Sequence, residues 1–211
     1  MYAKFLVVIL GLCVTVLAGN PAYGAGPSPA AILVWGDSLS SGFGLKKRQE
    51  WPALLQTRLR EKGFDYTVVN ESVTGETTAG GLTRLPEALG RVKPAVLIIE
   101  LGGNDGLRGL PPMVMADNLT AMVALGKEHG AKVLLAGMML PPNYGQAYVH
   151  NFSRVYEKVA KNQKVALLPF LLEGFGEKSQ MFQSDGIHPV AEAQPKIVDN
   201  IWESLQPLLS R

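Results

Sequence analysis

The stretch Ile32–Gly44 reads ILVWGDSLSSGFG. Its apolar residues end abruptly at Gly36-Asp37-Ser38, and small residues follow. This pattern is typical of a buried strand and the turn after it. Gly, Asp and Ser are ordinary turn residues, but a strand end is also where an α/β protein displays reactive side chains. The rest of the sequence has to decide between these two interpretations.

Short apolar runs and helix-like segments alternate along the chain. The runs are rich in Val, Ile and Leu and lie at Ala31–Trp35, Tyr66–Asn70, Ala95–Leu101, Lys132–Met138 and Val165–Leu168. Segments with a helical spacing of apolar residues lie at Trp51–Lys62, Thr78–Arg91, Met113–Gly130, Val149–Lys161 and Ala191–Leu209. Strands buried on both faces that alternate with helices predict an α/β fold, with a five-stranded parallel sheet in a three-layer α/β/α arrangement.

The first 24 residues differ from the rest of the chain. Lys4 is the only charged residue before Asp37, and Phe5–Ala18 is a predominantly apolar stretch followed by small residues. We expect residues 1–24 to be a secretory signal peptide that is cleaved near Gly24-Ala25. The alternative is an uncleaved membrane anchor, for which the apolar stretch is short, because a span needs about 20 apolar residues.

The remaining residues, 25–211, are expected to form one domain in the periplasm or outside the cell. Cleavage would remove Cys13, the only cysteine, so the mature protein would have no disulfide and no cysteine ligand for a metal. The chain has 20 Lys and Arg residues against 18 Asp and Glu residues. This balance gives no electrostatic case for binding nucleic acid or an anionic membrane. We interpret the one basic run, Lys46-Lys47-Arg48, as a solvated loop.

Polar segments follow the predicted strands. Asp37-Ser38 follows the first strand, Asn70–Gly75 the second and Gly102–Asp105 the third, and Asp185–Pro189 precedes the last helix. Because ligands and reactive groups of open parallel sheets gather beyond the carboxyl ends of the strands, these segments are expected to share one site.

A serine hydroxyl becomes a nucleophile only with a base to take its proton and a third group to orient that base. His188 lies three residues after Asp185 in a tight segment, so one turn could present both an imidazole and a carboxylate. The other histidines, His129 and His150, are interpreted as surface residues. Each polar segment alone also has a structural explanation, but their joint occurrence in this order favours catalysis by Ser38.

Four motifs together resemble the sequence blocks of the GDSL/SGNH hydrolase family. They are GDSLS (Gly36–Ser40), NESVTGETT (Asn70–Thr78), GGND (Gly102–Asp105) and DGIHP (Asp185–Pro189). The resemblance extends from about Ile32 to the final helix and is closest to the bacterial periplasmic branch of thioesterase I, arylesterase and lysophospholipase enzymes. It implies a flavodoxin-like SGNH hydrolase fold.

The resemblance also implies a role for each matching residue. Ser38 corresponds to the nucleophile, His188 to the base and Asp185 to the residue that orients the base. The implied oxyanion hole consists of the backbone N–H groups of Ser38 and Gly75 and the side-chain amide of Asn104. Asp37 is not the catalytic acid in this interpretation, and we expect it to form a local hydrogen bond that shapes its turn.

Two segments are candidates for an acyl-binding site. GLRGLPP (Gly106–Pro112) follows the oxyanion asparagine, and MLPPNYGQAY (Met139–Tyr148) follows the fourth predicted strand. Their alternative role is connection and core packing. The residues expected to contact the acyl chain are Leu107, Leu110, Leu140 and Tyr144.

The sequence thus implies a monomeric serine hydrolase that cleaves carboxylic esters, acyl thioesters and lysophospholipids through an acyl-enzyme. No metal or cofactor is expected, since acyl transfer needs none and the histidines lack a ligand motif such as H-E-x-x-H. After signal cleavage no stable membrane span is expected. The alternatives are a carbohydrate or polysaccharide acetylesterase, a flavodoxin-like phosphate or nucleotide binder, and a non-catalytic exported interaction protein.

Overall fold

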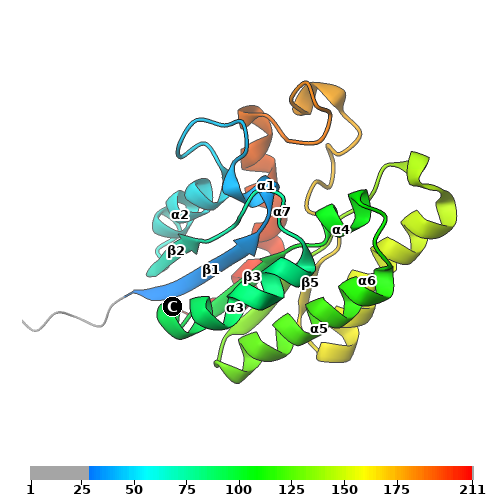
Figure 1. The fold of residues 1–211 in the computed structure, drawn as a ribbon. Coiled ribbons are helices and arrows are strands. Elements are labelled where there is room, and N and C mark those ends of the chain that lie inside the picture. Colours follow the sequence, from blue (N-terminus) through cyan, green and yellow to red (C-terminus); the bar gives the residue numbers. More distant parts are fainter. Residues whose placement is uncertain (1–28, 211) are drawn as a thin grey trace, which may run out of the picture.

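The computed structural model describes residues 29–210, so the expected signal peptide lies outside the described residues. Its centre is a sheet of five parallel strands in the order β2-β1-β3-β4-β5 (Figure 1). The strands are β1 (Ala30–Gly36), β2 (Tyr66–Asn70), β3 (Val96–Glu100), β4 (Lys132–Ala136) and β5 (Ala166–Leu168). This order is the flavodoxin-like one, and it confirms the predicted α/β fold class.

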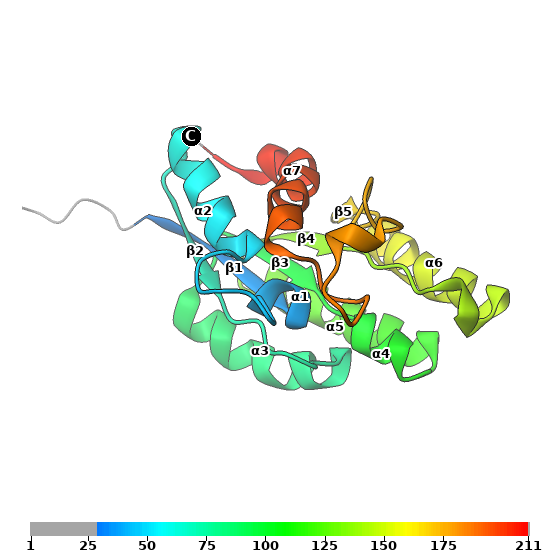
Figure 2. The same cartoon turned by 90° about the horizontal axis from the view of Figure 1, so that it is seen from above.

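Helices cover both faces of the sheet. They are α1 (Ser38–Ser41), α2 (Trp51–Glu61), α3 (Thr78–Val92), α4 (Gly103–Leu107), α5 (Pro112–Glu128), α6 (Gln146–Gln163) and α7 (Gln194–Leu205). Helices α2 and α7 pack together on one face, and α3, α5 and α6 cover the other (Figure 2). The result is the predicted three-layer arrangement.

The core forms where the two helical layers meet the sheet. Every residue of β3 is buried, and so are Ile32–Gly36 of β1, because a central parallel strand is covered on both faces. The apolar face of α2 buries Trp51, Leu55 and Leu59 against this layer. These contacts hold the carboxyl ends of β1 and β3 rigidly side by side.

The sheet has a switch point between β1 and β3. The chain leaves β1 toward β2 on one side, whereas β3 leads to β4 and β5 on the other side. The loops after β1 and β3 therefore diverge, and their divergence leaves room for a site at the carboxyl edge. In Figure 1, α1 and α4 mark this edge.

Most predicted elements occur within a few residues of their expected bounds, but three details differ. The short helices α1 and α4 were not expected, and Leu107 ends α4 rather than lying in a loop. The predicted helix Ala191–Leu209 is a 3₁₀ turn, then α7, then a second 3₁₀ turn. Pro195 lies in the first turn of α7, where a missing N–H disrupts no helical hydrogen bond.

No helix within residues 29–210 has the length and apolar character needed to cross a lipid bilayer.

Candidate active site

Ser38, His188 and Asp185 form a continuous hydrogen-bonded line. The Oγ of Ser38 lies 2.8 Å from Nε2 of His188, and Nδ1 of His188 lies 2.7 Å from Oδ2 of Asp185. Ser38 begins α1 directly after β1, whereas the other two residues lie in the segment before α7. The fold thus brings together residues 150 positions apart in the sequence, as the motifs predicted.

The carboxylate of Asp185 fixes the state of the imidazole. Its Oδ1 accepts backbone hydrogen bonds from Ile187 (2.9 Å) and His188 (3.0 Å). The bond from the backbone N–H of His188 is the main cause that lowers the pKa of Asp185 to about 2. The ionised carboxylate only accepts hydrogen bonds, so Nδ1 of His188 carries the proton and Nε2 is free to accept the proton of Ser38.

Contacts on both sides hold the His188 segment in place. The backbone N–H of Gln183 donates to the carbonyl of His188 (2.8 Å), and the Gln183 side chain donates to the carbonyl of Phe43 (2.8 Å). The Phe43 ring lies 4.5 Å, centroid to centroid, from the imidazole. Phe43 therefore restricts the ring position of the base, a role that no sequence motif indicated.

The turn that carries Ser38 is a tightly packed helix start. Asp37 caps α1 by accepting a hydrogen bond from the N–H of Leu39 (3.0 Å), which confirms the expected local bond. A Cβ atom at Gly36 would come within 2.6 Å of both the Glu100 carboxylate and the Ser40 hydroxyl, so only glycine fits there. Gly36 thus lets β1 approach β3 where the nucleophile emerges.

Asp37 also makes a long-range contact that the sequence did not predict. Nδ2 of Asn104, in the first turn of α4, donates to Oδ2 of Asp37 at 2.9 Å. The same carboxylate therefore caps the helix of the nucleophile and orients the amide of the expected oxyanion residue. The second hydrogen of Nδ2 remains available for a substrate oxygen.

Gly75, the third expected oxyanion residue, lies on the segment after β2. This segment is fastened to the nucleophile turn, since Val73 donates to the carbonyl of Gly36 (3.0 Å) and Thr74 pairs with Ser41 (2.9 Å). Gly75 has a φ of +78°, a backbone conformation that L side chains rarely adopt. The segments with the three expected oxyanion residues therefore gather around the same turn.

A second carboxyl group lies beneath this turn. Glu100 is fully buried at the end of β3, where Oε2 accepts hydrogen bonds from the Ser40 hydroxyl (2.6 Å) and the Asp37 N–H (3.3 Å). Burial raises the pKa of Asp37 to about 6 and, with the nearby Asp37 charge, raises the pKa of Glu100 well above 4.5. Only Asp37 also accepts a hydrogen bond from Asn104, so we assign the charge of the pair to Asp37 and a proton to Glu100.

Asp105 of the GGND motif has a structural role. Its two carboxylate oxygens accept hydrogen bonds from the backbone N–H (2.8 Å) and the hydroxyl (2.6 Å) of Thr78. Asn118 of α5 donates to the same hydroxyl (3.0 Å). This buried cluster ties the start of α3 to α4 and α5, and it fixes the helix that carries Asn104.

The two segments expected to bind an acyl chain contact each other at the edge of the site. The Tyr144 hydroxyl donates to the carbonyl of Leu107 (3.2 Å), and the Tyr148 hydroxyl donates to that of Leu110 (2.7 Å). The side chain of Leu110 is 38% exposed, whereas Leu140 is only 7% exposed and lies in the core. Of the two leucines, Leu110 is thus the one that a bound molecule can reach in this structure.

The remaining histidines have surface positions, as expected. His129 follows α5 with its Nδ1 2.9 Å from the carbonyl of Leu125, and it is exposed. His150 is exposed on α6, within the helix rather than at its start.

The sequence and the fold of this chain are similar to those of known proteins. The model of the GDSL-like lipase/acylhydrolase family matches residues 34–194. The esterase TesA of Pseudomonas aeruginosa is 54% identical over 178 residues, which cover 84% of this chain and 89% of that protein. The thioesterase 1/protease 1/lysophospholipase L1 of Escherichia coli K12 is 43% identical over 179 residues, 85% of each chain. A crystal structure of TesA superposes with a TM-score of 0.83 at 54% identity, covering 85% of this chain and 99% of that one.

Proposed function

The chain belongs to the GDSL-like lipase/acylhydrolase family, and from this premise we propose that it cleaves carboxylic esters and acyl thioesters through an acyl-enzyme on Ser38. The observation that carries the proposal is the line from Ser38 Oγ through His188 to Asp185, with distances of 2.8 and 2.7 Å. Family membership makes the protein a serine esterase of the GDSL type. The assignment of roles to individual residues is our proposal.

In the acylation step, Oγ of Ser38 attacks the carbonyl carbon while Nε2 of His188 takes the hydroxyl proton. The carbonyl oxygen becomes an oxyanion, which accepts hydrogen bonds from the Asn104 amide and the N–H groups of Ser38 and Gly75. The imidazolium then donates its proton to the leaving alcohol or thiol. The C–O or C–S bond of the substrate breaks, and an ester on Ser38 remains.

In the deacylation step, a water molecule replaces the leaving group. Nε2 of His188 takes one proton of the water as its oxygen attacks the acyl-enzyme, and the same oxyanion donors stabilise the second intermediate. The proton returns to Ser38 Oγ as the ester bond breaks and the carboxylic acid departs. Asp185 stabilises the imidazolium in both steps without taking a proton, consistent with its lowered pKa.

We propose esters and thioesters with an apolar acyl chain as the substrate class, including lysophospholipids. Two observations support this choice. Exposed Leu110 provides an apolar surface beside α4, and the relatives are an esterase and an enzyme named thioesterase 1 and lysophospholipase L1. Leu107 and Tyr144 border the same surface, and Leu140 supports it from the core.

We also propose that the protein is exported to the periplasm and is a monomer. Export rests on the apolar stretch and small residues within residues 1–24. An exported enzyme would meet lipid and ester substrates of the cell envelope rather than cytosolic acyl-CoA.

The experiment compares turnover of p-nitrophenyl esters from acetyl to palmitoyl with matched acyl-CoA thioesters, using the chain from Ala25 and its Ser38→Ala variant. We expect serine-dependent turnover that favours medium or long chains. A preference for acetyl would instead favour the carbohydrate acetylesterase alternative. Turnover that persists in Ser38→Ala would contradict the assignment of the nucleophile.

A further inference from the structure

Large apolar side chains are exposed on one part of the surface of the described chain. Within residues 29–210, the exposed large hydrophobic residues are Phe43, Val73, Leu110, Met113, Val114, Met139 and Ile187. We call these seven residues the apolar rim. Single exposed apolar residues are normal on a soluble protein, but their concentration in one region marks an interaction surface.

All members of the apolar rim lie on the carboxyl edge of the sheet. Phe43 follows β1, Val73 follows β2, and Met139 follows β4. Leu110 lies between α4 and α5, and Met113 and Val114 form the first turn of α5. Because the strands are parallel, the segments that follow them emerge at the same edge.

Three members of the apolar rim lie beside the catalytic residues. The Phe43 ring contacts the His188 imidazole, and Ile187 precedes that histidine. Val73 is hydrogen-bonded to Gly36, two residues before Ser38. Any large partner that covers this surface therefore faces the nucleophile directly.

We propose that the apolar rim docks onto a phospholipid surface, so that the enzyme takes lipid substrates from the layer in which they reside. The inference rests on the proposed function, because single-chain phospholipid esters partition into such layers. Met113, which is 73% exposed, and Val114 would enter the acyl region, as apolar side chains of interfacial segments do. Ser38 would then face the headgroup level, where the ester bonds lie.

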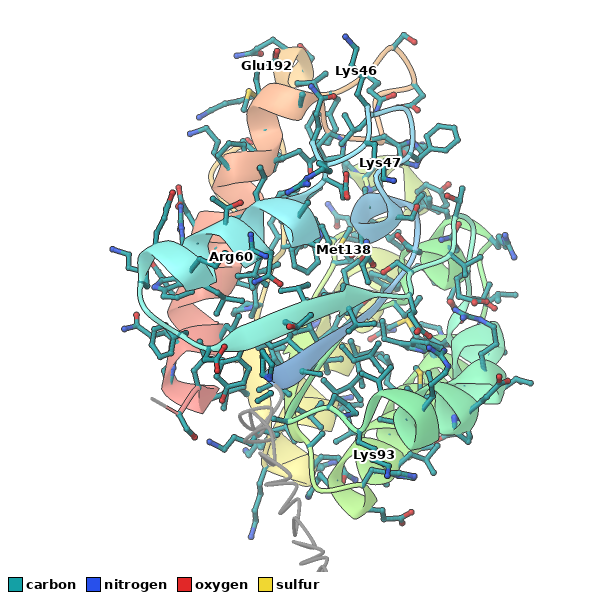
Figure 3. The ribbon with its side chains drawn as sticks, turned by 90° about the vertical axis from the view of Figure 1, so that its left-hand side faces the viewer. Lys46, Lys47, Arg60, Lys93, Met138 and Glu192 are labelled. Carbon is teal, nitrogen blue, oxygen red and sulfur yellow. The ribbon has the colours of Figure 1, made fainter. Side chains whose placement is uncertain are left out.

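The basic residues beside the apolar rim are complementary in charge to the phosphate groups of a lipid layer. Lys46, Lys47 and Arg48 are exposed in the loop after Phe43, and Arg108 is exposed two residues before Leu110. None of the four forms an ion pair with the part of the chain that the structure describes. Figure 3 shows Lys46 and Lys47 at one end of the molecule and Lys93 at the opposite end.

Carboxylates occur at this edge as well, so charge alone does not explain the docking. Glu173 and Glu177 lie between β5 and α7, and Glu192 lies in the turn before α7. The balanced charge of the whole chain agrees with this mixture. We therefore expect apolar insertion to supply the affinity for neutral lipid and the basic loop to add to it on anionic lipid.

A second copy of the chain fits this surface less well than lipid does. In a symmetric dimer built on the apolar rim, each copy would cover the other's Ser38. The exposed basic loops of the two copies would also lie on the same shared surface, where like charges repel each other.

The test measures the partition of the exported, processed protein onto vesicles by sedimentation. The vesicles are phosphatidylcholine alone and an equimolar mixture of phosphatidylcholine and phosphatidylglycerol. We expect the parent to bind both, and the double variant Met113→Ser/Val114→Ser to bind about tenfold more weakly. Lys46→Gln/Lys47→Gln should weaken binding to the mixed vesicles by about fivefold per lysine.

The matched control is Lys62→Gln/Lys93→Gln, which removes the same charge at the ends of α2 and α3, on the opposite edge of the sheet. It should bind as the parent does. The inference fails if the parent does not bind vesicles, or if Met113→Ser/Val114→Ser binds equally well. It also fails if this double variant converts a dimer into a monomer in sedimentation velocity.

Hydrolysis of soluble p-nitrophenyl acetate without lipid separates this inference from the proposed function. We expect the parent and Met113→Ser/Val114→Ser to hydrolyse it at equal rates, which also shows that the variant is folded. A parent that binds vesicles but hydrolyses no ester would leave the docking surface standing and contradict the proposed function instead.

Discussion

Asn104 is held by Asp37, whose Oδ2 accepts a hydrogen bond of 2.9 Å from Nδ2 of the asparagine. The two residues are 67 positions apart and lie at the carboxyl ends of neighbouring strands. An asparagine amide can rotate to exchange its oxygen and nitrogen, and a carboxylate accepts only from the nitrogen. Asp37 therefore directs the donor of Asn104 into the site, and the predictions about the oxyanion hole follow from this contact.

Asp37→Asn should lower kcat about tenfold to a hundredfold while KM changes little. An amide at this position can keep the cap on Leu39 with its oxygen, but its nitrogen then faces the nitrogen of Asn104. Two donors cannot bond to each other, so the amide of Asn104 turns away from the oxyanion position. Steady-state kinetics on p-nitrophenyl esters measure this change.

The control for Asp37 is a double-mutant cycle with Asn104→Ala. If Asp37 acts through Asn104, then Asp37→Asn should reduce kcat little further once Asn104 is already alanine. If Asp37→Asn lowered kcat by the same factor in the parent and in Asn104→Ala, Asp37 would act independently of Asn104, for example by capping α1.

Asn104→Ala alone should lower kcat by roughly 10²–10³, the usual effect of removing one oxyanion donor. The residue is partly buried, and α4 remains anchored by Asp105 and Thr78, so the melting temperature should stay within a few degrees of the parent. A kcat within twofold of the parent would mean that Asn104 has only a structural role.

Glu100→Gln should flatten the dependence of stability on pH. Burial raises the pKa of Glu100 above the unfolded value of 4.5, so above that pH the folded state holds a proton that the unfolded state releases. The free energy of unfolding of the parent therefore falls as the pH rises through this range. Glutamine has no titrating proton, so the free energy of unfolding of the variant should fall less as the pH rises.

Urea unfolding of the parent and Glu100→Gln between pH 5 and pH 8 measures the effect. The contribution of Asp37, whose pKa is raised from 3.8 to about 6, should remain in both proteins. If the free energy of unfolding changed with pH in the same way in the two proteins, Glu100 would be ionised in the folded state.

Hydrolysis should weaken on the acidic side because the pKa of Asp37 is raised to about 6, and a protonated Asp37 holds the amide of Asn104 less firmly. Asp185, with a pKa of about 2, stays ionised throughout this fall and does not contribute to it. A pH profile of kcat/KM for the parent should therefore have a steeper acidic limb than the profile of Asp37→Asn, which has no such proton to take up. Identical acidic limbs in the two proteins would mean that protonation of Asp37 does not affect the oxyanion hole.

Leu110→Ser should reduce kcat/KM for long-chain esters relative to acetate, with little change in melting temperature, because the residue is 38% exposed. Leu140 is an unsuitable site for the same test. It is buried, so a polar replacement would cost about 2–5 kcal/mol of stability and obscure any effect on substrate choice. An unchanged ratio of long to short esters in Leu110→Ser would remove this leucine from the acyl site.

The sequence predicted what depends on local pattern. The strands and long helices have clear apolar periodicity, and the motifs indicate Ser38, Asp185 and His188 as residues of one site. The short helices α1 and α4 were missed because four or five residues carry no periodicity. Local pattern does not give the order of the strands, since that order depends on packing between distant segments, and only the family resemblance implied it.

The polar network beneath the site was missed for a related reason. Asp37 was expected to bond only locally, because nothing in its neighbourhood indicates a partner on another strand. Glu100 did carry a signal, since it is a charged residue within the apolar run VLIIEL. A buried carboxyl group in such a strand needs hydrogen-bond partners or a proton: Oε2 of Glu100 accepts a hydrogen bond from the Ser40 hydroxyl, and burial raises the pKa of the group.

The most direct test of the central claim is covalent labelling with diethyl p-nitrophenyl phosphate, followed by peptide mapping with mass spectrometry. We expect one diethylphosphoryl group per chain, attached to Ser38, with esterase activity lost in proportion to labelling. Ser38→Ala should remain unlabelled and inactive. Labelling of a different residue in step with the loss of activity, or substantial activity in Ser38→Ala, would contradict the claim that Ser38 carries the acyl group.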